Sequence, residues 1–265
     1  MVRANGQPVT VNAGRVFLSA EWRNLVMLNY RVDPAILKRF VPPGTEIDSF
    51  EGNTYISVVG FQFLRTRMYG AVPIPYHVNF DEVNLRFYVR RRESEELRRG
   101  VVFIKEVVPR RAIAEVARFF YGEKYAQCRM RHKIWEGPAK AAEYEWRFQN
   151  RWYAVSAAAT SPPFLPSDGS MEQFITEHYG GYSVRRDGRC VEYRVSHEPW
   201  RVWRASSSAF KGDGDVLYGD GFGNYLKQPA DSALIAEGSE IQVHTPRLLV
   251  EPAEPVAAGA GLARW

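Results

Sequence analysis

The chain has 265 residues, 45% of them hydrophobic and 25% charged, which is typical of a soluble globular protein with one large domain or two small ones. Its formal net charge is +5, but the basic run at 90–92 leads directly into Glu93, so the charge predicts no nucleic-acid partner and favours an anionic small molecule instead. No apolar run approaches membrane-spanning length and the N-terminus lacks a signal-peptide core, so we expect a cytoplasmic protein without a membrane partner.

The cysteines and histidines form no metal or disulfide pattern. Cys128 and Cys190 fall within strand-like alternation and lack metal-ligand spacing, so both are expected to be reduced thiols. The five histidines show no paired ligand spacing, no Gly-x-Ser-x-Gly segment marks a serine nucleophile, and no Gly-x-Gly-x-x-Gly segment follows a strand. We therefore expect neither a metal nor a cofactor.

The first part of the chain predicts an arm, a strand and a short helix. Residues 1–15 are polar and predict a loose N-terminal arm. Residues 16–31 predict a strand, and Arg23 near the start of its apolar part must reach a rim or find a partner, because a buried charge is costly. Asp33 caps a short helix that has a proline at its first position, and residues 50–64 contain a second strand.

Residues 80–89 predict a strand whose two faces differ in polarity. Glu82, Asn84 and Arg86 share one face. The opposite face is apolar and predicts core, with the residues Val83, Leu85, Phe87 and Val89. The polar face is either the lining of a pocket or an outer, solvated face of the sheet, and the sequence leaves both open. The proline-rich segment 65–79 before it is, in the same way, a pocket border or a stiff linker.

Residues 112–130 predict a helix, a turn and a strand in succession. The helical part has apolar residues spaced three and four apart at Ile113, Val116, Ala117 and Phe120. The turn that follows carries Glu123, Lys124 and Tyr125. Functional groups often lie on such connections because the flanking elements hold them rigidly, although a solvated turn with an ordinary surface lysine is the alternative.

The rest of the chain predicts further strands and one more helix. Strands or hairpins are predicted at 101–108, 144–155, 182–195 and 238–250. Ser170 caps a short helix, residues 211–224 predict a mobile loop because their acidic residues do not form a calcium-binding set, and residues 251–265 form a flexible tail. Many strands with about three short helices predict a mainly β fold, with one antiparallel sheet that is closed or strongly coiled, in a single domain at 16–250.

Several segments carry a family pattern. They are Trp22 to Arg31 with Asp33-Pro34, the strand Phe80-x-Glu82-x-Asn84-x-Arg86-x-Tyr88-Val89, Ala117-Arg118 running to Lys124-Tyr125, Phe174 to Tyr182, and Tyr193 to Trp200. Together they resemble the uncharacterised DUF2071 (YqjF-like) family of the acetoacetate decarboxylase-like superfamily. The resemblance implies a large antiparallel β cone or barrel that encloses a pocket, with short peripheral helices, which agrees with the strand count.

The resemblance also implies functional residues. The decarboxylases place an arginine near the start of their first main strand, to which Arg23 corresponds, and their pocket glutamate corresponds to Glu82. Their Schiff-base lysine belongs to an adjacent pair after the helix, whereas an ungapped comparison puts Tyr125 and Ala126 at that pair and Lys124 just before it. The adjacent glutamate favours the ammonium form of this lysine, and imine formation needs the free amine.

Two kinds of function follow from these assignments. In a lyase-like enzyme such as a decarboxylase, Arg23 would bind the substrate's carboxylate, Glu82 would move a proton, and Lys124 would form an imine or act as a cation. The expected substrate-binding residues are Arg86, Tyr125, Asn84 and His197. The alternative is a non-catalytic binding protein, or an enzyme that uses the tyrosine, glutamate and arginine of this set without lysine chemistry. Both functions predict a small organic acid or carbonyl compound as the ligand, and both need Arg23 and Glu82 to converge inside the sheet. The sequence does not decide whether the protein forms a homo-oligomer.

Overall fold

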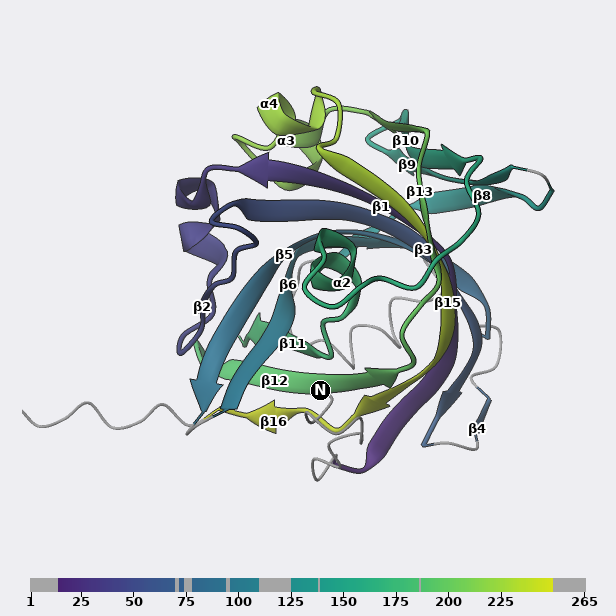
Figure 1. Ribbon diagram of the computed structural model, residues 1–265. Coiled ribbons are helices and arrows are strands. Elements are labelled where there is room, and N and C mark those ends of the chain that lie inside the picture. Colours follow the sequence, from purple (N-terminus) through teal and green to yellow (C-terminus); the bar gives the residue numbers. More distant parts are fainter. Residues whose placement is uncertain are drawn as a thin grey trace, which may run out of the picture.

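The computed structural model describes residues 14–69, 72–73, 78–93, 96–109, 125–137, 139–185 and 187–249 (Figure 1). Most of the predicted N-terminal arm, the predicted helix after residue 112, Lys124 and the predicted tail lie outside these residues. No helix within the described ranges combines the length and the apolar character that a membrane crossing requires.

Two sheets and four short helices make up the described fold. The larger sheet contains β1 (Val16–Val32), β2 (Glu46–Ile47), β3 (Thr54–Met68), β4 (Val72–Pro73), β5 (Phe80–Glu93), β6 (Glu96–Val108), β7 (Tyr125–Gln127), β11 (Gly180–Val184), β12 (Cys190–His197), β13 (Val202–Arg204), β15 (Ser232–His244) and β16 (Arg247–Leu248). The smaller sheet contains β8 (Arg129–Trp135), β9 (Lys140–Phe148), β10 (Arg151–Ala159) and β14 (Ser207–Lys211). The helices are η1 (Pro34–Phe40), α2 (Met171–Thr176), α3 (Gly214–Tyr218) and α4 (Gly223–Leu226).

The larger sheet closes on itself. Its main strands follow the order β15, β1, β3, β5, β6, β11 and β12, and β12 then pairs with β15 through Val195 and Val243. Neighbouring strands in this ring are antiparallel except β6 and β11, which pair in parallel. Figure 1 looks into the ring, with α2 lying across the opening. The predicted mainly β fold with a closed antiparallel sheet is confirmed.

Each ring strand has one face turned into the ring and one turned outward, and both faces are buried along β5. Val83, Leu85 and Phe87 are fully buried on the outer face, in a core that the ring forms with the smaller sheet. Tyr144 and Trp146 of β9 belong to the same core. The inner face carries polar residues and faces the ring's interior, so the sequence alternative of an outer, solvated face is wrong.

Among the irregularities of the ring strands, two bulges lie beside residues of the polar row or of the predicted site. In β1 the register shifts between Arg23 and Val26, and Asn24 adopts a left-handed backbone with a φ of 54°. In β6 the register against β5 shifts between Leu85 and Arg86, so that Ile104 is the extra residue. A bulge exchanges the faces of all residues that follow it, and therefore decides which side chains enter the ring.

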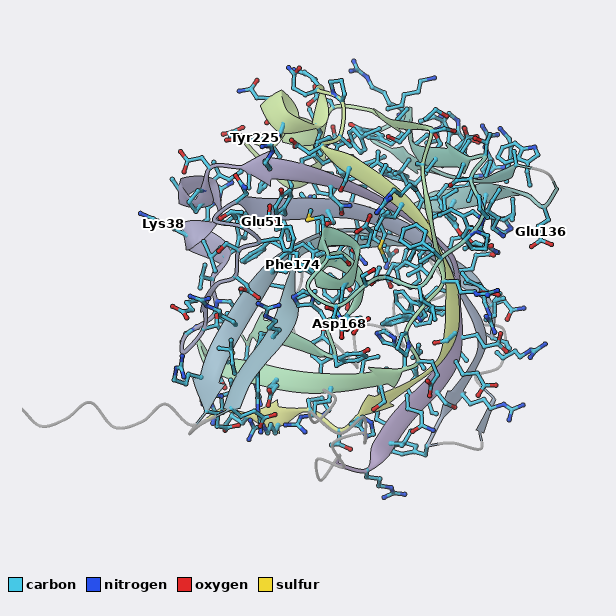
Figure 2. All side chains as sticks on the ribbon, in the orientation of Figure 1. Lys38, Glu51, Glu136, Asp168, Phe174 and Tyr225 are labelled. Atoms are coloured by element: carbon cyan, nitrogen blue, oxygen red, sulfur yellow. The ribbon has the colours of Figure 1, made fainter. Side chains whose placement is uncertain are left out.

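Two of the short helices, η1 and α2, begin at the predicted caps. Asp33 accepts a hydrogen bond from the Ala35 amide at 2.8 Å at the start of η1, and Ser170 accepts one from the Gln173 amide at 3.2 Å at the start of α2. Figure 2 shows Phe174 of α2 over the opening of the ring, whereas Lys38 of η1 projects outward.

The segment at 211–224 differs from its prediction as a mobile loop. It folds into α3 and α4, and the Asp215 carboxylate accepts hydrogen bonds from the amides of Gly221 and Gly223 at 3.0 and 2.7 Å. Leu217 and Phe222 are fully buried in the core shared by the two sheets. The acidic residues that fail to form a calcium site therefore fix the backbone, and the apolar residues between them anchor it.

Candidate functional site

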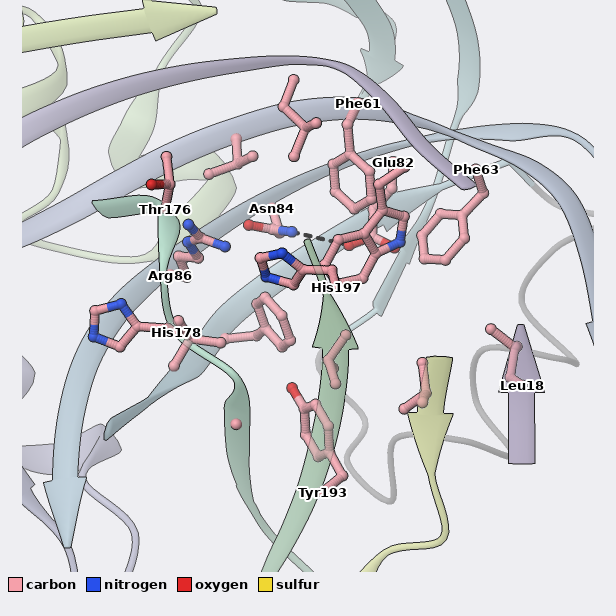
Figure 3. Close-up of a pocket in the computed structure, with 18 of the residues that line it drawn as sticks. Leu18, Phe61, Phe63, Glu82, Asn84, Arg86, Thr176, His178, Tyr193 and His197 are labelled. Atoms are coloured by element: carbon pink, nitrogen blue, oxygen red, sulfur yellow. Dashed lines mark hydrogen bonds between the residues drawn. The ribbon is translucent and has the colours of Figure 1, made fainter. Parts of the chain in front are cut away.

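The ring encloses a cavity of about 60 Å³, shown in close-up in Figure 3. Its wall is mostly apolar and includes the aromatic residues Trp22, Phe61, Phe63, Phe80, Phe103 and Trp200. The polar residues that interrupt this wall include Glu82, Asn84, Arg86, His178, Tyr193 and His197. One water molecule needs roughly 10–15 Å³ of such space, so the cavity accommodates several waters or a ligand of a few heavy atoms. An apolar cavity with a few convergent polar groups is the usual form of a small-molecule site.

The polar face of β5 runs along the cavity. Glu82 and Asn84 are only 2% and 1% exposed, and the Asn84 Nδ2 donates a hydrogen bond to the Glu82 Oε1 at 2.9 Å. The other carboxylate oxygen of Glu82 and the side-chain oxygen of Asn84 have no hydrogen-bond partner among the described residues. Because an unpaired buried polar atom costs free energy, these two atoms are suited to bind a ligand.

The environment of Glu82 makes its carboxyl an effective proton donor and acceptor near neutral pH. Burial raises the pKa of Glu82 to about 7, against smaller opposing effects of the Asn84 hydrogen bond and the Arg86 charge. A group whose pKa lies near the working pH is the most efficient general acid or base.

The end of the cavity beside α2 carries nitrogen donors. The Arg86 guanidinium donates to the Ile175 carbonyl at 3.0 Å and lies 5.6 Å from the centre of the Tyr88 ring, while its Nε has no partner among the described residues. His178 is 8% exposed, and neither of its ring nitrogens has a hydrogen-bond partner of good geometry within the described ranges.

His178 stays neutral in this position. Burial lowers its pKa well below the usual value, and the charges of Arg86 and Arg99 lower it further, whereas the nearby Phe174 carbonyl opposes them weakly. A neutral imidazole carries one N–H, so this end of the cavity offers donors from Arg86 and His178 to an anionic group.

His197 presents a hydrogen-bond acceptor to the same cavity. Its Nδ1 donates to the Glu198 carbonyl at 2.9 Å, and its ring stacks on Trp200 with centroids 4.2 Å apart. Burial lowers the pKa of His197 to about 4, so the ring is neutral and its Nε2 keeps a lone pair.

A second buried carboxylate, which the sequence analysis missed, lies beside the polar row that Glu82, Asn84 and Arg86 form on β5. Glu106 is 2% exposed and stands directly opposite Asn84 in the pairing of β5 with β6. Tyr125 of β7 pairs with Glu106 from the other side, and its hydroxyl hydrogen-bonds to the Glu106 carboxylate. Strict alternation from Phe103 would put Lys105 inside the ring, but the bulge at Ile104 turns Glu106 inward in its place.

Arg23 does not enter the cavity, so the expected convergence of Arg23 with Glu82 is wrong. Trp22 and Leu25 line the cavity, and the β1 bulge places Arg23 on the outer face between them. The Arg23 guanidinium donates to the Glu21 carboxylate at 2.9 Å and to the Gly238 carbonyl at 3.2 Å. The charge of Arg23 is therefore paired, which was one of the two outcomes that the cost of a buried charge allowed.

The other expected site residues fall into two groups. The structure brings Glu82, Asn84, Arg86 and His197 to one cavity and Tyr125 to its neighbouring carboxylate, Glu106. Lys124 lies outside the described residues. Within the described residues, no group of three or more His, Cys, Asp or Glu side chains is arranged to hold a metal ion, and Cys128 and Cys190 are buried as thiols rather than as disulfides.

The closed ring of strands, with a row of polar residues on its inner face, defines the class of fold. Comparisons with solved structures agree with this class. Over 92% of this chain and 94% of the other, the fold matches the enduracididine biosynthesis enzyme MppR complexed with pyruvate, with a TM-score of 0.62 and 17% identity. It matches acetoacetate decarboxylase from Legionella pneumophila with a TM-score of 0.62 and 11% identity, over 92% of each chain. A third match is an acetoacetate decarboxylase-like enzyme from Sphingomonas wittichii RW1, with a TM-score of 0.59 and 12% identity over 94% of this chain and 98% of that one. These likenesses show an acetoacetate decarboxylase-like fold.

The sequence comparison places the chain more narrowly. The model of DUF2071, described as an uncharacterised conserved protein, matches residues 19–240, and the chain belongs to this family. The uncharacterised protein YqjF of Bacillus subtilis (strain 168) is 27% identical over 202 residues, which cover 75% of this chain and 80% of YqjF.

Proposed function

We propose that the cavity binds a small organic acid that carries a carbonyl group, and that Glu82 transfers a proton to or from this ligand. The observation that carries the proposal is a single, buried, partly unpaired carboxyl with a pKa of about 7 in an otherwise mostly apolar cavity. Such a group is poised for general acid–base catalysis.

The polar groups of the cavity support this class of ligand. The donors of Arg86 and His178 suit a carboxylate at the α2 end, and the aromatic wall suits a short carbon skeleton. Glu82 lies four residues along the same strand from Arg86, so an acid bound to Arg86 extends towards the Glu82 carboxyl. One structural relative is described as complexed with pyruvate, a small keto acid, which is consistent with this choice.

The chemistry needs only groups on the described residues. The ionised Glu82 takes a proton from the carbon next to the ligand's carbonyl, the C–H electron pair moves into an enolate, and N–H donors stabilise the negative oxygen. The reverse step returns the proton from Glu82 to carbon, as is needed after loss of carbon dioxide from a keto acid. Under this proposal the protein is a lyase-like or proton-transfer enzyme.

Solvent exchange tests the proposal directly. Pyruvate and acetoacetate are incubated with the protein in D₂O, and the loss of C–H signal and the release of carbon dioxide are followed. Glu82→Gln is expected to slow exchange by at least about 100-fold while changing ligand affinity only a few-fold, because proton transfer by a positioned group contributes about that much.

The proposed binding of the ligand's carboxylate by Arg86 is tested with a matched pair of variants. Arg86→Gln is expected to weaken ligand affinity by about 10-fold or more, since hydrogen bonds to charged groups contribute on the order of 1.5–3 kcal/mol. Arg90→Gln on the same strand is the control, because Arg90 donates to Glu46 away from the cavity. Ligand affinity that is equal in both variants would contradict the assignment of Arg86.

Two outcomes separate the alternatives. Binding of the keto acids without any exchange or decarboxylation would indicate a non-catalytic binding protein. A borohydride-trapped adduct in the wild type that Lys124→Met abolishes would show that an imine forms, and would replace the mechanism above with lysine chemistry.

A further inference from the structure

The cavity continues past Glu82 on the side away from Arg86. On β5, Phe80 lines the cavity two residues before Glu82, whereas Arg86 lies four residues after it. Phe80 pairs with Phe63 of β3, and Phe63 pairs with Trp22 of β1, so these three aromatic residues form one row across the sheet. Figure 3 shows Phe63 and Arg86 on opposite sides of Glu82. The ligand groups assigned above occupy the Arg86 side and leave this other end of the cavity unassigned.

Two buried polar atoms at this other end have no hydrogen-bond partner among the described residues. They are the Nε1 of Trp22 and the Oγ1 of Thr66, and both residues line the cavity. Thr66 is only 1% exposed, and its amide donates to the Val78 carbonyl at 3.0 Å, which places it just beyond the aromatic row. Because an unpaired buried donor costs free energy, both atoms are suited to bind an oxygen atom of a ligand.

A bulge in β3 turns Thr66 towards the cavity. Phe61 and Phe63 line the cavity, so strict alternation would place Arg65 inside. The register against β1 shifts here, and Arg65 adopts a left-handed backbone with a φ of 53°. Its guanidinium pairs with the Glu21 carboxylate at 2.6 Å, and neither residue lines the cavity. The bulge therefore keeps a cation out of the cavity and puts a hydroxyl in its place, at the cost of a strained backbone.

The chemistry of this end suits a neutral hydrogen-bond acceptor. The indole N–H of Trp22 only donates, and the hydroxyl of Thr66 donates or accepts. Arg86 carries the positive charge of the described cavity lining, and it lies at the opposite end. A second carboxylate of the ligand would lack a cation here, and a buried unpaired charge is costly. A methyl group would leave both protein atoms unpaired, so a hydroxyl or carbonyl oxygen fits best.

We propose that Trp22 and Thr66 form a second subsite, and that the cavity takes a small oxo acid whose chain ends in a hydroxyl or carbonyl oxygen. This inference rests on the proposed function, because carboxylate binding by Arg86 and proton transfer by Glu82 stay as assigned, and it adds the class of substrate. Trp22 and Thr66 determine specificity, since they contact a part of the ligand that does not react. The small volume of the cavity limits the chain between the two ends of the ligand to a few atoms.

Three ligands that differ at one end test the subsite by isothermal titration calorimetry. They are 4-hydroxy-2-oxobutanoate, 2-oxopentanoate, in which a methyl group replaces the hydroxyl, and 2-oxoglutarate, in which a carboxylate replaces it. The wild type is expected to bind the hydroxyl ligand about 10-fold more tightly than the methyl analogue, because the analogue leaves buried polar groups unpaired. The carboxylate analogue is expected to bind at least about 10-fold more weakly than the hydroxyl ligand.

A matched pair of threonine variants locates the preference. Thr66→Val removes the hydroxyl and keeps the shape of the side chain, so it is expected to lower the preference for the hydroxyl ligand over the methyl analogue by about 5-fold. Thr176→Val is the control, because Thr176 also lines the cavity but its hydroxyl donates to the Glu172 carbonyl at 2.7 Å. The control is expected to keep the preference of the wild type.

The indole N–H of Trp22 gives a readout that does not depend on affinity. In protein labelled with ¹⁵N at the indole nitrogens, Trp22→Phe identifies the signal of Trp22. The hydroxyl ligand is expected to move the proton of this signal downfield by forming a hydrogen bond, and the methyl analogue is not.

Each outcome decides for or against the subsite. Equal affinity of the wild type for the three ligands, or an equal loss of both ligands in Thr66→Val, overturns the subsite and leaves proton exchange by Glu82 standing. Tightest binding of 2-oxoglutarate overturns the neutral class of ligand. A protein that neither binds nor exchanges any of these acids, pyruvate or acetoacetate rejects the proposed function and the subsite with it.

Discussion

β5 and β6 are adjacent strands that each carry a buried glutamate on the face turned into the ring, yet only one of the two glutamates was predictable. β5 alternates without interruption along its inner face, so Glu82, Asn84 and Arg86 share one side as the sequence indicates. β6 contains an extra residue at Ile104, and this residue turns Glu106 inward. Regular alternation can be counted from a sequence, whereas a bulge depends on how the neighbouring strand pairs.

The largest expected change in the free energy of unfolding is at the outer face of β5. Phe87 is fully buried on the outer face between the two sheets, so Phe87→Ala is expected to lower the free energy of unfolding by about 3–5 kcal/mol through lost burial and a cavity. Arg92→Ala, exposed near the end of the same strand, should change it by less than about 0.5 kcal/mol. Urea denaturation measures both, and equal values would contradict the assignment of the outer face as core.

The inner face of β5 predicts a pH-dependent effect. The pKa of Glu82 is about 7 in the folded protein and 4.5 is its ordinary value, so between these pH values the folded state binds more protons than the unfolded state. The contribution of Glu82 to stability is therefore greatest below pH 4.5 and falls as pH rises to about 7, by up to about 3 kcal/mol. Glu82→Gln should remove this dependence.

Urea denaturation at pH 5 and at pH 8 checks this contribution. The free energy of unfolding of Glu82→Gln, relative to that of the wild type, should be higher at pH 8 than at pH 5. A difference that is the same at both pH values would show that Glu82 titrates in the folded protein as it does in water.

A smaller loss of stability is expected at Gly238, which lies opposite the bulge of β1. Gly238 pairs with Arg23 and has a φ of 80°, and an added Cβ would lie 1.9 Å from the Trp22 carbonyl oxygen. Gly238→Ala is expected to lower the free energy of unfolding by about 1–3 kcal/mol because the left-handed backbone is strained by a side chain and the contact must relax. Gly137→Ala, with nothing within 4 Å of its added Cβ, is the control in thermal unfolding.

The smallest expected loss of stability concerns Lys105, the residue before Glu106 on β6. Lys105 faces the outer core, where its amine donates to the Leu217 carbonyl and lies 5.6 Å from the Phe148 ring centre. Lys105→Met is expected to cost about 1 kcal/mol of stability through this lost hydrogen bond, and to leave the titration of Glu82 and the affinity for keto acids unchanged. A shift of that titration in Lys105→Met would contradict the placement of Lys105 on the outer face of the ring.

Much of the fold followed from local signals. The caps at Asp33 and Ser170 begin helices as predicted, and the number of strands indicated a closed antiparallel sheet. The alternation of β5 placed its apolar residues in the core, but the same pattern fitted a solvated outer face equally well. The difference depends on what packs against the strand, and that information lies in distant segments.

The errors have a common physical origin. Arg23 was expected inside because the resemblance to the decarboxylases implied it, and no sequence signal marked Glu106 as an inward-facing residue. A bulge lies beside each residue: the β1 bulge follows Arg23 and turns Leu25 inward, and the β6 bulge precedes Glu106 and turns it inward. The segment at 211–224 was expected to be mobile because its acidic residues bind no calcium, but Asp215 instead accepts amide hydrogen bonds from its own loop.

The sequence by itself determined the family, the mainly β class, the positions of most strands and two helix caps, and a row of polar residues on one strand, because each depends on neighbours along the chain. Only the tertiary structure decided which face of that strand is enclosed, which arginine lies with Glu82, and that a second carboxylate stands beside it. These depend on strand register and on closure of the sheet, and both are set by contacts between residues far apart in the chain.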